Sequence, residues 1–249
     1  MSDGARLRLD RLLANLGYGS RRQVQSLVRS GQVRLDGRTL SDPEARLDAA
    51  EDLPRRMSVG GEPLDPPFPL VVMMNKPTGI VCSHRDQGER VYDLLPARWR
   101  RRMPALSSIG RLDKETSGLL LLTDDGGFLH RVISPKKNVG KRYIAELELP
   151  LHGREAQIFA SGELLLEGED SPLLPARLEV LSEKRAALTI REGRFHQVRR
   201  MFASQGNRVV SLHREAIGGL RLPCDLAPGG FRPLGAAEAG CIFDAAPGI

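Results

Sequence analysis

The sequence predicts an α+β protein with two domains of unequal size, and three patterns support this prediction. Residues 9–28 place leucine and valine at helical spacing, and short strand-like runs around an Asp-Gly turn follow them. Residues 65–69 contain three prolines, which stiffen the chain and remove backbone donors, as expected of a linker. Residues 70–249 alternate strand-like apolar runs with helical stretches. We therefore predict a small α/β domain over residues 1–64 and, after the linker, a larger domain on a mixed, mainly antiparallel sheet with flanking helices.

The composition indicates a soluble, cytoplasmic protein. Of its 249 residues, 41% are hydrophobic and 27% are charged, which is usual for a globular chain able to bury a core. No apolar run approaches the ~18 residues that a membrane span needs, and the N-terminus lacks the apolar stretch of a secretory signal. The three cysteines lie far apart, so neither a disulfide framework nor a zinc cluster is expected. We expect a monomer without membrane contact.

The charge favours a nucleic-acid partner. Lysine and arginine number 37 against 31 acidic residues, which gives a net charge of +6, and arginines make up 31 of the 37. The planar guanidinium suits phosphate oxygens and also stacks on bases. A genome-wide preference for arginine codons would produce the same bias, so charge alone does not decide the partner.

The N-terminal unit begins with two predicted helices. Leucines at helical spacing over residues 9–16 share one face of the first. Ser20 and Gln23 form the capping-box pattern that starts the second. Residues 33–40 then predict two short strands around a hairpin turn, and residues 55–59 predict a further strand.

Arg21 and Arg22 lie in the first turn of the second predicted helix. The free N–H groups there favour an anion, so the pair is a candidate phosphate site. The alternative is a solvated cationic face without a ligand. The order of helix, Ser-Arg-Arg helix, Gly-x-Val strand and Asp-Gly turn resembles the small RNA-binding domain first seen in ribosomal protein S-four, over most of residues 1–60. This resemblance implies phosphate contacts that position RNA.

The larger domain opens with an apolar strand over residues 70–74 and a Pro-x-Gly turn that follows Lys76. Lys76 is a candidate phosphate contact, and the alternative is a solvated turn lysine. A basic run at residues 97–103 surrounds the single tryptophan. Contact with RNA and plain solubility explain that run equally well.

Residues 110–126 are the stretch around which the larger domain is organised. Four leucines at 119–122 predict a short strand that is buried on both faces. Arg111 and Asp113 lie in the polar loop that leads into this strand. A rigid element therefore holds a carboxylate that can still face a cleft.

Two other interpretations of this loop stay open on spacing alone. In the simpler one, Asp113 makes a turn and Arg111 pairs on the surface. The other is a metal site, but the acids lack the spacing of a Ca²⁺ loop and no histidine or cysteine stands among them. The acids that would form it are Asp113, Glu115, Asp124 and Asp125.

Residues 141–149 alternate as a half-buried strand that contains Tyr143, and residues 176–181 and 186–190 predict further strands. Taken alone, Tyr143 is an ordinary core or edge aromatic residue. A cationic helix follows these strands. Its apolar face is predicted to hold Phe195, Val198, Met201 and Phe202.

Two arginines of that predicted helix are candidates for a site. Arg199 and Arg200 are predicted to project from its other faces. Taken alone, this is an amphipathic helix with a cationic exterior, and His196 is a packed histidine.

The motifs of the larger domain resemble those of the pseudouridine synthases, most closely the RsuA-type enzymes that modify small-subunit ribosomal RNA. Together with the N-terminal unit, the resemblance covers nearly the whole chain. Glu115 stands where the family more often has aspartate, which leaves the catalytic carboxylate untouched. The matching stretches are residues 75–79, 110–113 with Thr116, Gly118 and the leucine run, Lys141-x-Tyr143, and residues 196–201, 206–210, 212–214 and 217–220.

The resemblance implies a role for each candidate residue. Asp113 matches the one catalytic residue that the family cannot replace, and Arg199 matches the basic residue that pairs with it. Tyr143 matches the ring that stacks on the target base. Arg111 would occupy or stabilise the opened RNA helix. Lys76 and Arg200 would contact RNA.

The implied reaction is the isomerisation of a specific uridine in 16S ribosomal RNA. Uridine and pseudouridine are isomers, so neither a cofactor nor a metal is expected. The base must leave its stack, the N1–C1′ bond must break, and C5 must bond to C1′. The expected partner is ribosomal RNA, either free or in a ribosomal assembly intermediate.

Two alternatives differ in target or in chemistry. One is a 23S rRNA synthase of the same fold. The other is a non-catalytic RNA-binding protein of ribosome assembly. Asp113 argues against the second, because a carboxylate repels phosphate and a pure binder has no need of it.

Overall fold

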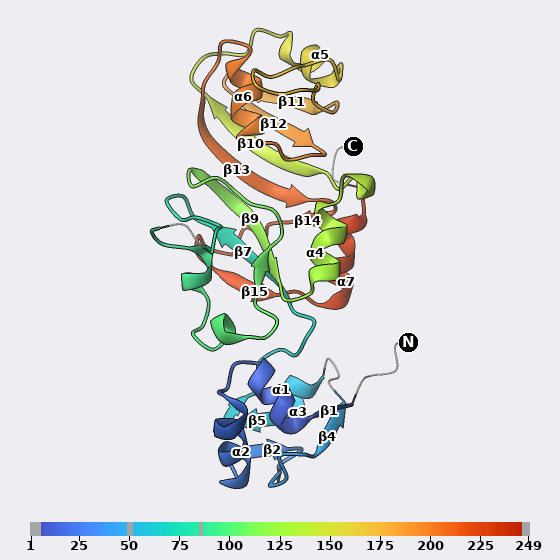
Figure 1. Ribbon diagram of the computed structural model, residues 1–249. Coiled ribbons are helices and arrows are strands. Elements are labelled where there is room, and N and C mark those ends of the chain that lie inside the picture. Colours follow the sequence, from blue (N-terminus) through green and yellow to red (C-terminus); the bar gives the residue numbers. More distant parts are fainter. Residues whose placement is uncertain (1–5, 49–51, 85–86, 246–249) are drawn as a thin grey trace. The chain divides into compact units, whose positions relative to one another are not determined.

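The computed structural model describes residues 6–48, 52–84 and 87–245, and the chain forms two compact units (Figure 1). Unit 1 comprises Met1–Val71, Tyr92–Ser107 and Thr123–Gly126. Unit 2 comprises Val72–Val91, Ser108–Leu122 and Gly127–Ile249. Unit 1 therefore includes two segments that follow the proline-rich stretch in the sequence. A sequence-domain boundary at residues 65–69 stays a prediction.

The N-terminal part of unit 1 combines short helices with antiparallel strands. β1 pairs with β4, and a second sheet has the order β3-β2-β5-β6. The apolar core comes from leucines of α1, valines of α2 and residues of β2 and β5. The elements are β1 (Arg6–Arg8), α1 (Leu9–Asn15), α2 (Arg21–Arg29), β2 (Val33–Leu35), β3 (Arg38–Thr39), β4 (Arg46–Asp48), α3 (Leu53–Arg56), β5 (Met57–Val59) and β6 (Glu62–Pro63).

The two predicted N-terminal helices and the hairpin between β2 and β3 are confirmed. At the start of α2, Ser20 Oγ accepts from the Gln23 N–H at 3.4 Å, and Gln23 Oε1 accepts from the Ser20 N–H at 2.8 Å. The capping box therefore satisfies two donors of the first turn. In the hairpin, Asp36 and Gly37 have φ of 49° and 77°, the left-handed pair that a tight hairpin turn requires.

The strand predicted over residues 55–59 is wrong in its first half. Residues up to Arg56 belong to α3, and the strand β5 begins at Met57. Pro54 lies in the first turn of α3, where its fixed φ and missing N–H suit the start of a helix.

A buried ion pair lies in the later segments of unit 1. Arg102 and Asp124 have side chains only 1% and 2% exposed and approach to 2.6 Å. The other oxygen of Asp124 accepts from the Leu70 N–H at 2.7 Å. Asp124 is therefore committed to holding this part of the chain together, which removes it from the four-acid metal site considered above. Trp99 of the basic run is also buried.

Unit 2 is built on a mixed sheet of order β11-β12-β10-β13-β9-β7-β15, with β14 beside β13 and β8 beside β9 (Figure 1). β13 runs parallel to β9, whereas the pairs formed by β10, β11, β12, β14 and β15 are antiparallel. This confirms the predicted mixed, mainly antiparallel sheet. The strands are β7 (Val71–Lys76), β8 (Ser107–Ser108), β9 (Thr116–Thr123), β10 (Lys141–Leu147), β11 (Arg177–Ser182), β12 (Arg185–Ile190), β13 (Val209–Ile217), β14 (Leu220–Arg221) and β15 (Phe231–Pro233).

Helices flank this sheet at two places. α5 and α6 lie near β11 and β12, and α4 and α7 lie beside the strands that follow β13 in the sheet order (Figure 1). Phe159 of α5 and Phe202 of α6 meet edge to face at 5.4 Å, so aromatic contacts join the first pair. The helices are α4 (Gly126–Ile133), α5 (Glu155–Ala160), α6 (Gln197–Ala203) and α7 (Ala236–Gly240). Across the described ranges, none of the helices combines the length and the apolar character needed to cross a bilayer.

Candidate active site

A buried lysine organises the loop that contains Asp113. Lys76 ends β7, and its side chain is 0% exposed. Its ammonium donates to the main-chain carbonyls of Asp113 at 3.1 Å, Lys114 at 3.3 Å and Thr116 at 2.9 Å, and to that of Pro77 at 3.0 Å. Burial lowers the pKa of Lys76. The prediction that Lys76 contacts RNA phosphate is wrong, because its ammonium is buried and donates to main-chain carbonyls of the protein.

Further main-chain bonds hold the same loop. The Thr116 N–H donates to the Asp113 carbonyl at 3.0 Å, and the Gly79 N–H donates to the Lys114 carbonyl at 2.8 Å. Leu112 is buried, and its N–H points to Cys82 Sγ at 3.5 Å. The backbone is therefore fixed on both sides of Asp113, while the carboxylate itself is 34% exposed. Such a group can reach a substrate from a rigid support.

His196 is the side chain that meets the Asp113 carboxylate. Its Nε2 lies 3.5 Å from Asp113 Oδ1, and its side chain is 42% exposed. His196 immediately precedes α6 and has left-handed backbone angles, with φ of 48° and ψ of 30°. This conformation is uncommon outside glycine, asparagine, aspartate and histidine. His196 is therefore neither in a helix nor packed in the core.

The expected pairing of Arg199 with Asp113 differs from the structure. Arg199 donates to the main-chain carbonyls of Glu115 at 2.9 Å and Val209 at 3.0 Å. Among the residues that the structure describes, His196 and not Arg199 places a side-chain nitrogen within 4 Å of the Asp113 carboxylate. Arg199 therefore joins α6, β13 and the Asp113 loop through backbone atoms, and supports the site indirectly.

Arg199 also lines a cavity of about 310 Å³ beside the Asp113 loop. Ser117 Oγ and His213 Nδ1 lie 2.9 Å apart in its wall, and burial lowers the pKa of His213. Its other lining residues are Thr78, Glu115, Arg208, Val209, Val210, Ser211 and Leu212. The wall is polar and is formed mainly by β13 and the start of β9.

Tyr143 lies on β10 and is linked to β9 by a buried arginine. Its ring is 7% exposed, and its hydroxyl accepts from Arg214 Nη1 at 3.3 Å. Arg214 also donates from Nε to the Leu119 carbonyl at 2.8 Å. Its remaining nitrogen, Nη2, is buried and has no hydrogen-bond partner among the residues that the structure describes. A free N–H group of this kind beside an aromatic ring can donate a hydrogen bond to a substrate oxygen.

Gly118 lets β9 approach β13 at this point. Its φ is +107°, and a Cβ there would lie 2.3 Å from the Arg214 carbonyl oxygen. Gly118 is therefore needed because β9 and β13 approach too closely at this point for a side chain. It does not serve to make a loop flexible.

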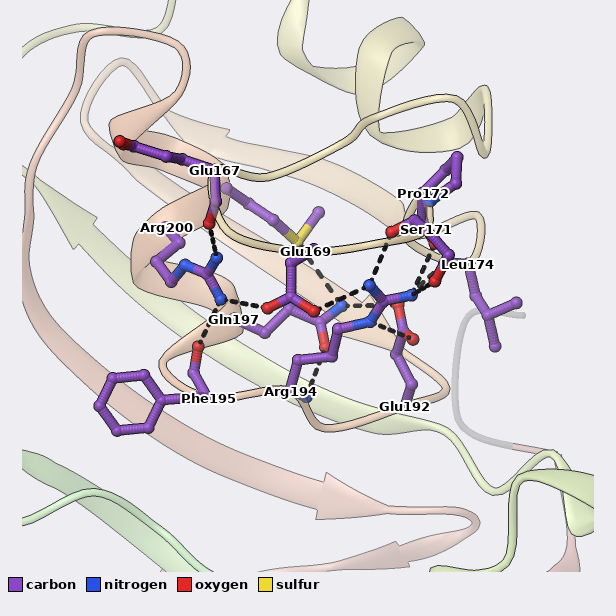
Figure 2. A network of polar contacts seen from close by, with 11 residues as sticks. Glu167, Glu169, Ser171, Pro172, Leu174, Glu192, Arg194, Phe195, Gln197 and Arg200 are labelled. Carbon is purple, nitrogen blue, oxygen red and sulfur yellow. Dashed lines mark hydrogen bonds and ion pairs between the residues drawn. The ribbon is translucent and has the colours of Figure 1, made fainter.

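Figure 2 shows that Arg200 belongs to a network of polar contacts within the protein. Arg200 Nη1 donates to Glu169 at 2.6 Å, and Nη2 donates to the Glu167 carbonyl at 2.5 Å. Glu169 also accepts from Arg194 at 3.0 Å. The prediction that Arg200 contacts RNA is therefore replaced by a structural role, since acidic and carbonyl oxygens already occupy its guanidinium.

Phe195 is also placed differently from the prediction. α6 starts at Gln197, so Phe195 lies before the helix and its side chain is 72% exposed. Val198, Met201 and Phe202 do form the buried face. The helical spacing identified three of the four core positions, but the left-handed turn at His196 directs Phe195 elsewhere.

Three arginines named from the sequence are exposed. Arg21 and Arg22 occupy the first turn of α2, and Arg111 lies two residues before Asp113. The residues whose roles the sequence did not indicate are the loop-holding Lys76, the buried Arg214 and the Asp113 partner His196. All three lie in stretches that match the family, which marked them as worth attention. The sequence spacing of these residues did not predict which groups they contact.

Comparison with known proteins assigns both parts of the chain. Residues 70–204 match the family described as RNA pseudouridylate synthase, and residues 7–53 match the S4 domain. The chain is 41% identical to ribosomal small subunit pseudouridine synthase A of Yersinia pestis, over 95% of this chain and 98% of that protein. It is 40% identical to the protein of the same name from Escherichia coli (strain K12), over 95% and 100%.

A solved structure described as a pseudouridylate synthase is also similar. It is 36% identical, with a TM-score of 0.66, and the match covers 95% of this chain and 99% of that one. The family match spans the Asp113 loop, Tyr143 and α6. The chain therefore belongs to the RNA pseudouridylate synthase family and carries an S4 domain at its N-terminal end.

Proposed function

We propose that this enzyme isomerises a specific uridine of 16S ribosomal RNA to pseudouridine, with Asp113 as its catalytic carboxylate. The observation that carries the proposal is the partly exposed carboxylate of Asp113 on a loop held by the buried ammonium of Lys76. The small-subunit target is supported by relatives about 40% identical over 95% of this chain, which are named ribosomal small subunit pseudouridine synthase A.

The geometry suits the chemistry of this isomerisation. The reaction needs a carboxylate that acts on the sugar or the base as the glycosidic bond breaks. A rigid loop keeps the Asp113 carboxylate in place without cost at the moment of reaction, and His196 at 3.5 Å can orient it. Tyr143 is proposed to stack on the everted uracil, after a small displacement that opens its ring to the substrate. The free Nη2 of Arg214 is then available to a uracil carbonyl oxygen.

RNA positioning is assigned to exposed cations. Arg21 and Arg22 are proposed to contact phosphates at the start of α2, where free N–H groups add to their charge. Arg111 is proposed to stabilise the opened RNA beside Asp113. We assign the reaction to the cytoplasm, to a monomer, and to ribosomal RNA or an assembly intermediate as substrate.

The test compares Asp113→Asn with Glu115→Gln, which removes an exposed charge from the same loop. Substrates are 16S and 23S transcripts and small-subunit particles from cells that lack this protein. We expect Asp113→Asn to keep its RNA affinity within a few-fold but to lose activity by on the order of 10⁴-fold or more. Glu115→Gln should stay within about threefold of the unchanged protein, because the Glu115 side chain is exposed and the contact of Arg199 is with its main-chain carbonyl, which the substitution keeps.

Three outcomes would contradict the proposal in different ways. Activity of Asp113→Asn close to that of the unchanged protein would remove the catalytic assignment. Isomerisation confined to 23S RNA would show that the target is a uridine of 23S RNA and not of 16S RNA. RNA binding without isomerisation on any of these substrates would favour the non-catalytic assembly protein.

A further inference from the structure

An exposed aromatic ring lies next to the Asp113 site. Phe195 is 72% exposed, the largest fraction among the large apolar side chains that the structure describes. One face of its ring stacks on the His196 ring, with centroids 3.9 Å apart and an angle of 14° between the planes. The high exposure therefore belongs to the opposite face and to the ring edge.

The two contacts of His196 connect the Asp113 carboxylate with the exposed ring of Phe195. His196 contacts Asp113 through Nε2 at 3.5 Å and Phe195 through its ring face. The order of groups is the Asp113 carboxylate, the imidazole, the phenyl ring and then its open face. A planar ligand on that open face would contact Phe195, and the Phe195 ring would separate it from His196, the residue that contacts Asp113.

The polar network of Figure 2 fixes the backbone that presents this ring. Arg200 Nη1 donates to the Phe195 carbonyl at 3.2 Å and to Glu169 at 2.6 Å. Glu169 also accepts from Arg194, which donates to the Pro172 carbonyl at 2.6 Å. Phe195 and His196 form a turn before α6, called here the Phe195–His196 corner. Ion pairs with Glu169 hold Arg194 before this corner and Arg200 after it.

This network also stabilises the ionised form of Glu169. Hydrogen bonds from Arg200 and Arg194 lower the pKa of Glu169, so it stays ionised at neutral pH. The corner is therefore held rigidly, and it displays an apolar ring that the fold does not cover. A rigid exposed ring of this kind costs little entropy when it binds a planar partner.

We propose that the open face of Phe195 is a stacking platform for a base that flanks the target uridine in the RNA. The proposal rests on the proposed function, since the RNA at Asp113 supplies the ligand. A nucleobase is the planar group that such RNA presents, and it stacks on aromatic side chains with little dependence on sequence. The flanking base and not the target is assigned to Phe195, because the imidazole separates this face from Asp113.

The first test measures kinetics on the RNA that the unchanged protein modifies. Variants are Phe195→Ala, Phe195→Leu and Phe195→Trp, with Val180→Ala on β11 as a control of similar exposure. Loss of one stacked base should lower kcat/KM by roughly 5- to 150-fold. Most of this loss should appear in KM, because the contact is present in both the bound substrate and the transition state.

The substitutions distinguish the effect of a planar ring that stacks on a base from the effect of apolar volume alone. Phe195→Trp should stay within a few-fold of the unchanged protein, and Phe195→Leu should resemble Phe195→Ala, because leucine is apolar but not planar. Val180→Ala should have no effect. Unchanged kcat/KM in Phe195→Ala, or full activity in Phe195→Leu, would overturn the proposal.

The second test does not depend on catalysis. RNA that carries 5-iodouridine at single positions on either side of the target is crosslinked to the protein by long-wave light. The crosslinked peptide is then identified by mass spectrometry. We expect a crosslink to Phe195 from a flanking position, and a crosslink to Phe195 only from the target position would overturn the assignment. Failure of the proposed function would instead appear as no isomerisation by the unchanged protein.

Discussion

The ammonium of Lys76 lies 3.1 Å from the main-chain carbonyl oxygen of Asp113, so a fully buried charge fixes the backbone of a residue whose carboxylate is partly exposed. The same ammonium reaches the carbonyls of Lys114 and Thr116. The buried ammonium therefore fixes the backbone of the loop, and the partly exposed carboxylate stays free for the catalytic role that we propose for it. This arrangement explains why an apparently ordinary turn lysine accompanies the Asp113 loop.

Replacement of Lys76 by methionine should destabilise the protein. The change leaves buried carbonyl oxygens without a donor, which costs about 2–4 kcal/mol in the free energy of unfolding. Urea unfolding followed by circular dichroism measures this loss. Lys114→Met is the matched control, because Lys114 is exposed on the same loop. Equal unfolding midpoints for the two variants would contradict the role of Lys76.

Replacement of His196 by asparagine should lower kcat by about 10-fold and leave the fold intact. Asparagine tolerates the left-handed backbone of this position but cannot reach Asp113 as the imidazole does. A contact with a charged group is worth enough to account for this loss. Single-turnover rates with saturating enzyme measure it, and thermal unfolding checks the fold. A variant with an unchanged single-turnover rate would show that His196 does not orient Asp113.

Replacement of Gly118 by alanine should be strongly destabilising. The added Cβ would clash with the Arg214 carbonyl at 2.3 Å, in a backbone conformation of φ +107° that alanine avoids. We expect a loss of about 2–4 kcal/mol in the free energy of unfolding, seen as a lower Tm. Gly240→Ala in α7 is the control, because nothing lies within 4 Å of its Cβ position. That change should be neutral or slightly stabilising. A similar Tm for both variants would argue against the close strand approach.

Lys141 should make stability depend on pH in the alkaline range. Burial, followed by the nearby charge of Arg214, lowers the pKa of Lys141 to about 8. The same amine titrates near pH ~10.4 in an unfolded chain. The unfolded chain therefore binds more protons between these values, so this contribution to the free energy of unfolding rises as pH increases from about 8 to about 10.4. It reaches its full value above the unfolded pKa and is lost as pH falls through the folded pKa.

Unfolding free energies at several pH values for the unchanged protein and Lys141→Met measure this effect. Other groups titrate in the same range, so the difference between the two proteins is the relevant quantity. We expect the unchanged protein to gain stability relative to the variant as pH rises. Parallel curves would mean that Lys141 keeps an ordinary pKa.

Local patterns predicted much of the fold. The Ser20–Gln23 capping box and the hairpin at Asp36 depend on neighbours within a few residues, and both formed as expected. The leucine run at residues 119–122 became a fully buried strand because a continuous apolar stretch needs cover on both faces. The strand at residues 55–59 failed in its first half because the start of a helix at Pro54 competed with it.

Side-chain partners in the site were not predictable in the same way. Arg199 was expected at Asp113, but its acceptors are backbone carbonyls, one of which is 84 residues away in the sequence. Phe195 was expected in the helix core, but a single left-handed residue at His196 turned it outward. Such contacts depend on where distant segments of backbone lie, which helical or strand spacing does not encode.

The sequence by itself determined the family, the two N-terminal helices with the hairpin that follows, and the position of Asp113 before a buried strand, because these depend on residues that lie close together along the chain. Only the tertiary structure decided which cations face inward. Lys76 and Arg200 carry the same charge as Arg21 and Arg22, but carbonyls and carboxylates from distant segments surround the first two. Charge identifies a residue that can bind RNA, whereas burial and prior partners decide whether it is free to do so.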